Sequence, residues 1–311
     1  PKVSASLQLD GGRIRGTVTN QSDRTLIAPA IVLGSSAATL KDLAPGASAE
    51  VNLPILSSNF DGRQLSDTVV GPYNWDGGQM SESQQRQLIR RSIIDQLSFD
   101  PMTGASGVLP GDSPTLLAWG NDPVTQAELE GAQVRREANV LYQIPLAMTI
   151  RGRNTFAADL LRSSALDVSA NFFNKDPWNI SFGIGEVTMA YQPLPFEGRL
   201  VPEQLVIAMG FGGDVTGLGG KHAILREQAR CDPDADGCAP PQDGMPELEI
   251  LDVRTGTWVQ FEHMTPGQAS EVENAARWVD PSTGQVQVKF VNERQDGIGF
   301  QFKVEITGTV E

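Results

Sequence analysis

The sequence has few of the residues that most often carry chemistry. It contains only two histidines, His222 and His263, which excludes a zinc site made of three histidines and any mechanism that needs several imidazoles. Lysines number six, and Lys plus Arg total 24 against 38 acidic residues, a formal charge of −14. Because binding to nucleic acid or to an anionic membrane requires a surplus of basic residues, this balance argues against both partners.

Long hydrophobic runs are also lacking. No stretch approaches the roughly 18 apolar residues of a membrane-spanning helix, and the longest run near the start, residues 26–34, is interrupted by Pro29. The chain begins at Pro1 and not at Met, so we expect it to be a processed or truncated product. Any signal peptide or membrane anchor would lie outside this sequence, and contact with a membrane would depend on that missing anchor.

Only two cysteines are present, Cys231 and Cys238, in the string CDPDADGC. Their closeness in a polar loop favours a local disulfide, the alternative being two reduced thiols, and the spacing does not match the CxxC motif of redox enzymes. Disulfides persist outside the reducing cytosol. Together with the acidic charge, this favours an extracytoplasmic protein, secreted or at the cell surface and tethered to the envelope.

Glycine and proline are abundant, with 32 and 20 residues, which is typical of a β-rich fold with many turns. We expect a mainly β, multidomain chain with three parts: residues 1–54, 55–150 and 151–311. In the first part, apolar residues alternate with polar ones, as in VSASLQL. This period of two indicates strands and predicts a small β-sandwich.

Residues 14–53 resemble the immunoglobulin-like modules of bacterial extracytoplasmic proteins. The strings GTVTNQSDRTLIAPAIVL and LAPGASAEVNL carry the resemblance. The matching positions are Gly16, Val18, Asn20, Asp23, Leu26, Leu43, Pro45, Gly46 and Leu53. The resemblance implies an immunoglobulin-like sandwich that serves as a spacer or adhesion element on a secreted or membrane-tethered protein.

The middle part, residues 55–150, contains the clearest helix, near 82–98. Ser81 can cap it, and Gln84 completes a capping box. One apolar stripe follows at helical spacing, formed by Ile89, Ile93 and Leu97 with Leu88 and Ile94 beside them, and we expect it to face a core. We expect the three arginines of the other face to be solvated, the alternative being an anion site: Arg86, Arg90 and Arg91. With the strand-like runs TLLAWG and NVLYQIPLAMTI, this part predicts a small α+β unit.

The last part, residues 151–311, alternates repeatedly, as in QVQVKFV and GFQFKVEITGTV. It predicts a larger two-sheet β-sandwich, similar to a jelly roll. Hairpin turns are expected at 254–257 and 280–284, where Gly256 and Gly284 supply a positive φ. Trp258 and Trp278 fall within predicted strands, so we expect them in the core.

The most specific motif is a run of alternating aspartates that matches the opening of a calcium loop. Its candidate ligands are Asp232, Asp234, Asp236, the carbonyl of Cys238, and Asp243 at the closing position. The run resembles the calcium loops of dockerin, EF-hand and thrombospondin-type repeats, although Asp stands where Glu is usual. It predicts a structural calcium ion, the alternative being an acidic, disulfide-pinned loop that binds none.

Enzyme motifs are not found. The glycine-rich string GFGGDVTGLGGKH does not match a phosphate loop, because Val215 and His222 occupy positions that require Gly and Ser or Thr. No G-x-S-x-G string occurs either. We therefore expect no nucleotide partner, and the sequence assigns no catalytic residue.

Three aromatic residues in predicted loops, Tyr73, Trp75 and Trp178, are candidates for stacking on sugar rings. The sequence thus favours a non-enzymatic, extracytoplasmic structural or interaction protein, whose partner is a protein or glycan of the cell envelope. The alternative is a carbohydrate-binding or glycan-active envelope protein.

Overall fold

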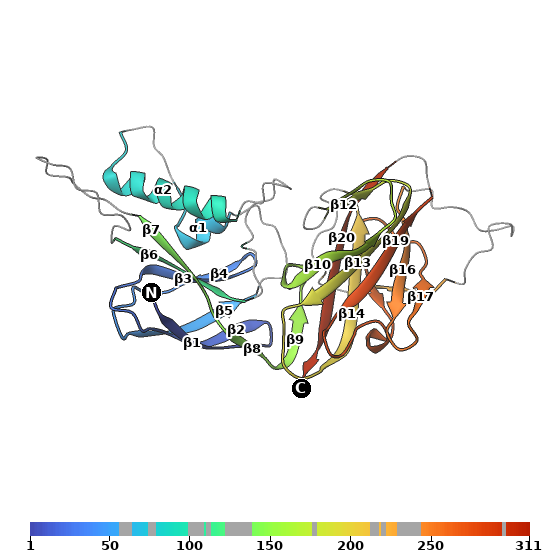
Figure 1. Cartoon of the computed structure of the whole chain (residues 1–311), viewed down its shortest axis with the longest axis horizontal. Coiled ribbons are helices and arrows are strands. Elements are labelled where there is room, and N and C mark those ends of the chain that lie inside the picture. Colours follow the sequence, from blue (N-terminus) through green and yellow to red (C-terminus); the bar gives the residue numbers. More distant parts are fainter. Residues whose placement is uncertain are drawn as a thin grey trace, which may run out of the picture. The chain divides into compact units, whose positions relative to one another are not determined.

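A computed structural model describes the chain at residues 1–55, 64–73, 79–98, 109, 113–121, 139–175, 179–211, 218, 222–228, 244–293 and 297–311. These residues fall into two compact units, 1–149 and 150–311. Both units consist mainly of β-strands (Figure 1), which confirms the mainly β, multidomain fold class. No helix within the described ranges is both long and apolar enough to cross a membrane.

The described part of the first unit contains two four-stranded sheets. One has the order β5-β2-β1-β8, with β1 at Val3–Asp10, β2 at Arg13–Asn20, β5 at Ser48–Pro54 and β8 at Met148–Ile150. The other has the order β4-β3-β6-β7, with β3 at Ile27–Leu33, β4 at Ser36–Thr39, β6 at Thr115–Gly120 and β7 at Val140–Pro145. The predicted alternation is confirmed in β1 and β2, where Leu7, Leu9, Ile14 and Val18 are buried.

Two helices, α1 at Leu65–Val69 and α2 at Glu82–Leu97, pack on the β4-β3-β6-β7 sheet (Figure 1). The predicted capping box begins α2: the Ser81 N–H donates to Oε1 of Gln84 at 2.9 Å, and the Gln84 N–H donates to Oγ of Ser81 at 3.3 Å. The predicted apolar stripe is only partly correct. Ile93 and Leu97 pack against the sheet, but Ile89 is 48% exposed and Ile94 is the residue with no exposure.

The expected boundary between residues 1–54 and 55–150 is not a division in the structure. Strand β3 pairs with β6, with Ile31 opposite Leu116, so the later segment completes the sheets of the earlier one. Every residue of β6 is buried, because one face lies in the sandwich and the other lies under the helices. A strand that is apolar on both faces must pack against other elements on both sides. Neither residues 1–54 nor residues 55–150 contain enough elements to cover both faces of β6.

The second unit contains two larger sheets among its described residues. One has the order β10-β13-β19-β16-β17, with β10 at Leu161–Val168, β13 at Gly185–Pro193, β16 at Glu247–Asp252, β17 at Thr257–Gln260 and β19 at Val286–Asn292. The other has the order β11-β12-β20-β14-β18-β15, and β9 also pairs with β20. Its strands are β9 Gly152–Phe156, β11 Phe173–Lys175, β12 Asn179–Phe182, β14 Leu200–Gly210, β15 Ala223–Leu225, β18 Ala269–Val272 and β20 Ile298–Val310. Two short 3₁₀ helices accompany them, η1 at Ala158–Leu160 and η2 at Ala275–Arg277.

Aromatic side chains join the two sheets of this unit. The ring of Phe290 in β19 lies 5.0 Å from that of Phe300 and 4.9 Å from that of Phe302, both in β20. The predicted inward positions of β19 and β20 are therefore correct. The predicted hairpin at 254–257 also forms, and Gly256 takes a φ of 71° there.

Candidate functional site

Several residues predicted to bind ligands lie outside the described residues. They are the cysteines and acidic residues of the predicted calcium loop, Cys231, Asp232, Asp234, Asp236, Cys238 and Asp243, and the aromatic residues Trp75 and Trp178. Tyr73 is described: its side chain is half-buried in the first unit, and its hydroxyl donates to Sδ of Met80 at 3.6 Å. Within the described ranges, no group of three or more His, Cys, Asp or Glu side chains gathers in a way that could hold a metal.

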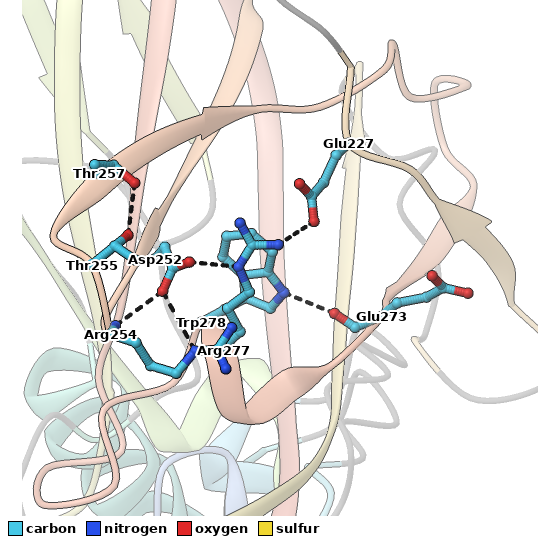
Figure 2. A network of polar contacts seen from close by, with 8 residues as sticks. All are labelled: Glu227, Asp252, Arg254, Thr255, Thr257, Glu273, Arg277 and Trp278. Atoms are coloured by element: carbon cyan, nitrogen blue, oxygen red, sulfur yellow. Dashed lines mark hydrogen bonds and ion pairs between the residues drawn. The ribbon is translucent and has the colours of Figure 1, made fainter.

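One polar network of the second unit centres on Asp252, at the end of β16 (Figure 2). The side chain is only 2% exposed, and its Oδ2 accepts a hydrogen bond of 2.5 Å from Nε of Arg277. Its Oδ1 accepts the backbone N–H of Arg254 at 2.9 Å, and Nε of Arg254 lies 3.8 Å away. A buried carboxylate is thus paired and hydrogen-bonded, as its desolvation requires.

Arg277 connects this carboxylate to other parts of the unit. Its Nη1 forms an ion pair with Glu227, and its Cζ lies 4.4 Å from the ring centroid of Trp278 (Figure 2). The Trp278 Nε1–H donates to the carbonyl of Glu273 at 2.8 Å. Trp278 itself is 1% exposed, which confirms the prediction that it belongs to the core.

The electrostatics fix both partners in their charged forms. Burial alone would raise the pKa of Asp252, but the hydrogen bonds from Arg277 and from the N–H of Arg254 outweigh it and hold that pKa below its usual value. The hydrogen bond to Asp252 raises the pKa of Arg277, despite its partial burial. Because both groups are charged near neutral pH and are bonded to each other, the pair supplies no general acid or base. We therefore interpret the network as a structural contact between loops.

A second cluster lies on the outward face of the same sheet, around Lys289 of β19. Its Nζ is 3.0 Å from Oε2 of Glu249 and 3.8 Å from Oε2 of Glu186, and 4.6 Å from the ring centroid of Trp258. Lys289 and Glu249 are only 16% and 11% exposed. The cluster thus combines a low-exposure ion pair with an aromatic ring.

The prediction that Trp258 belongs to the core is wrong. In β17, Val259 stands opposite Ile250, whose side chain is buried in the core. Since neighbouring residues of a strand point to opposite faces, Trp258 and Gln260 lie on the outward face, and Trp258 is half-buried there. β17 is an edge strand, so its apolar residues need not face inward.

Glu247 completes the outward cluster. Its Oε2 accepts a hydrogen bond of 3.2 Å from Nε2 of Gln260. Burial and then the charge of Glu293 raise the pKa of Glu247, while His263 acts in the opposite direction. A flat aromatic ring can stack on a sugar ring, and carboxylate and amide side chains near it can form hydrogen bonds with the hydroxyl groups of that sugar.

The first unit contains a third polar group, which corrects the prediction that the helix arginines are solvated. Arg91 is only 12% exposed and donates to Oδ1 of Asp67 at 2.7 Å and to the carbonyl of Gly71 at 2.5 Å. Arg90 is half-buried, with its Cζ 4.8 Å from the ring centroid of Trp119. Arg86 is exposed, as expected.

Arg277, Glu227 and Lys289 were not predicted from the sequence, because their partners are distant along the chain. One signal was available. The inward positions of β16 are 248, 250 and 252, and a charged residue at the last of them requires a partner.

Comparison with known proteins bears on the first unit. No curated protein matches the chain. Residues 2–149 match a family model described as a domain of unknown function, DUF8725, and this match ends where the first compact unit ends.

Proposed function

We propose that this chain is a non-enzymatic interaction protein of the extracytoplasmic envelope. Its second unit makes contact with a protein partner. The observation that supports this proposal is an exposed aromatic side chain held in a fixed place, Phe172, which is 49% exposed.

Phe172 lies where the chain bends between the two sheets of the second unit. A β-carbon added at Gly297 would lie 2.7 Å from Cζ of Phe172, and one added at Gly183 would lie 2.9 Å from its Cδ1. The ring therefore rests directly on two glycines. Nearby along the same paired segments, three aliphatic side chains are also exposed: Leu166 at 51%, Val168 at 39% and Ile184 at 42%.

Such a group favours a protein partner. Exposed apolar residues that gather in one region mark interaction sites more often than isolated ones do, and aromatic anchors held in place lose little conformational entropy on binding. The edge of β10 beside this group is partly blocked, since Nζ of Lys175 donates to the carbonyl of Ser163 at 3.0 Å. This favours side-chain contact with the partner over addition of a further strand.

The proposal is tested by placing a photo-crosslinking amino acid at Phe172 in the full-length gene product, in the organism that makes it. A matched control places it at Ile224, which is 43% exposed elsewhere in the unit. We expect one envelope protein to crosslink from position 172 and not from 224. Crosslinking from neither position, or equally from both, would contradict the proposal.

The extracytoplasmic location is tested separately. A fusion of the full-length gene product to alkaline phosphatase, whose activity requires disulfides formed outside the cytosol, should be active. An inactive fusion that is present at normal levels would place the protein in the cytosol.

A second candidate function is carbohydrate binding, favoured by the outward position of Trp258. A half-exposed ring on the same face of β17 as Gln260, whose amide also bonds to Glu247, offers a stacking surface with a hydrogen-bonding side chain two residues away. On a glycan array, we expect Trp258→Ala to abolish binding and Ile224→Ala to preserve it. The variants Trp75→Ala and Trp178→Ala test the aromatic residues predicted from the sequence. An array on which the unmodified protein binds no glycan rules this function out.

A further inference from the structure

Arg90 of helix α2 packs on the ring of Trp119. Trp119 lies in β6 and is 1% exposed, and the guanidinium of Arg90, from helix α2, stacks over its ring at 4.8 Å. A guanidinium that stacks by its flat face can keep the N–H groups of its two Nη atoms at its outer edge, where they can bind a planar or tetrahedral oxyanion with two parallel hydrogen bonds.

Those N–H groups have no partner in the part of the chain that the structure describes. The Nε–H of Arg90 is buried and donates no hydrogen bond there. The neighbouring Arg91 differs, since it is bonded to Asp67 and Gly71. A buried donor without an acceptor is unfavourable, so hydrogen bonds from the described residues do not explain the position of the Arg90 side chain.

The charges around Arg90 also favour an anionic ligand. Arg86 lies one helical turn before it, on the same face of α2, and no ion pair is formed by either side chain within the described ranges. Burial and then the charge of Arg86 lower the pKa of Arg90, while Asp42 raises it. The carboxylate of Asp42 already accepts the N–H of Ala28 at 2.7 Å. In a chain with a net charge of −14, two adjacent cations are left without a bonded carboxylate.

We propose that Arg86 and Arg90 form a binding site for a phosphate group on the helix-covered face of the first unit. Two guanidinium groups match the near-double negative charge of a phosphate monoester or of free phosphate better than they match a single carboxylate. Arg90 supplies the fixed, stacked guanidinium, and Arg86 adds a second charge at the surface. This inference does not depend on the partner proposed for the second unit.

The test is isothermal titration of the full chain with inorganic phosphate and with glycerol phosphate, at constant ionic strength, followed by the same titrations of four variants. We expect saturable binding that weakens at least tenfold in Arg90→Gln and in Arg86→Gln. Arg90→Lys should also weaken it, since an ammonium keeps the charge but loses the two-pronged geometry. Arg13→Gln, which removes the same charge from a half-buried residue of β2, away from the helices, should leave binding unchanged.

The two ligands distinguish the source of the phosphate: binding of both indicates a phosphorylated molecule, and binding of inorganic phosphate alone indicates the free ion. If Arg90→Gln fails to fold, the exposed Arg86→Gln still decides the matter. The proposal is overturned if neither ligand binds, if Arg86→Gln binds as well as the unmodified protein, or if Arg13→Gln loses as much affinity as Arg86→Gln.

Discussion

Asp252 and Arg277 lie 25 residues apart in the sequence, yet Nε of Arg277 is 2.5 Å from Oδ2 of Asp252. The pair joins the β16–β17 hairpin to the short helix η2, and Val253 adds a backbone hydrogen bond of 3.0 Å to the carbonyl of Arg277. Contacts between segments so far apart along the chain restrict how the loops at this end of the second unit can move.

Removing one partner of this pair should destabilise the second unit. We expect Asp252→Asn to lower the free energy of unfolding by about 1–3 kcal/mol, because Arg277 would keep its charge and lose the negative charge of its acceptor. Arg254→Gln is the control: this side chain is 67% exposed, so the loss should be below about 0.5 kcal/mol. Urea unfolding monitored by far-UV circular dichroism measures both, and equal losses would argue against a special role for Asp252.

The same pair predicts a dependence on acid. The folded-state pKa of Asp252 lies below the value of about 3.9 that the unfolded chain has. Its contribution to stability is therefore complete above pH 4 to 5 and is lost as the pH falls through the folded-state pKa. The difference in melting temperature between the unmodified protein and Asp252→Asn should stay constant from pH 7 to 5 and shrink toward pH 2.

Glu247 should behave in the opposite way. Its folded-state pKa is raised above the unfolded value of about 4.3, so the folded state binds more protons and its stability falls as the pH rises through that range. Glu247→Gln keeps an oxygen that can accept from Gln260 and removes the charge. We expect it to raise the melting temperature at pH 7 and to have little effect at pH 3. A variant that is less stable at pH 7 would contradict this.

The capping box of α2 makes a local prediction. Ser81→Ala removes the side chain that accepts the Gln84 N–H and should cost about 1 kcal/mol. Ser92→Ala, at an exposed position within the same helix, should be neutral or slightly stabilising, because Ala has the higher helix propensity. Thermal unfolding of the two variants should therefore shift in opposite directions or differ clearly in size.

The division of the chain predicts which fragments fold. Residues 1–149 contain both sheets and both helices of the first unit, so this fragment should show a cooperative thermal transition. Residues 1–113 lack β6 and β7, which leaves β3 paired on one side only, with β4, and the helices without Trp119. Dispersed amide signals in the NMR spectrum of residues 1–113 would contradict this prediction, because they would show that this fragment folds without β6 and β7.

The acidic loop predicted from the sequence has its own test. If Asp232, Asp234 and Asp236 hold calcium, the melting temperature should rise by several degrees in calcium relative to chelator, since an ion that binds only the folded state stabilises it. Asp234→Asn should remove that difference.

Mass measurement without reducing agent should also show two hydrogens missing if Cys231 and Cys238 are bonded.

The sequence by itself determined the features that depend on neighbouring residues. Alternation in β19 and β20, the glycine of the β16–β17 turn and the capping box of α2 all arise from contacts within a few residues, so they could be predicted.

Only the tertiary structure decided which strands pair and which face of a strand is covered. Periodicity predicts that Trp258 and Val259 face opposite ways, but the position of β17 at a sheet edge turns the tryptophan outward. In the same way, Arg90 lies over Trp119 because β6, far along the chain, completes the sheet beneath the helix. Such pairings depend on which distant surfaces fit together, and no local pattern encodes them.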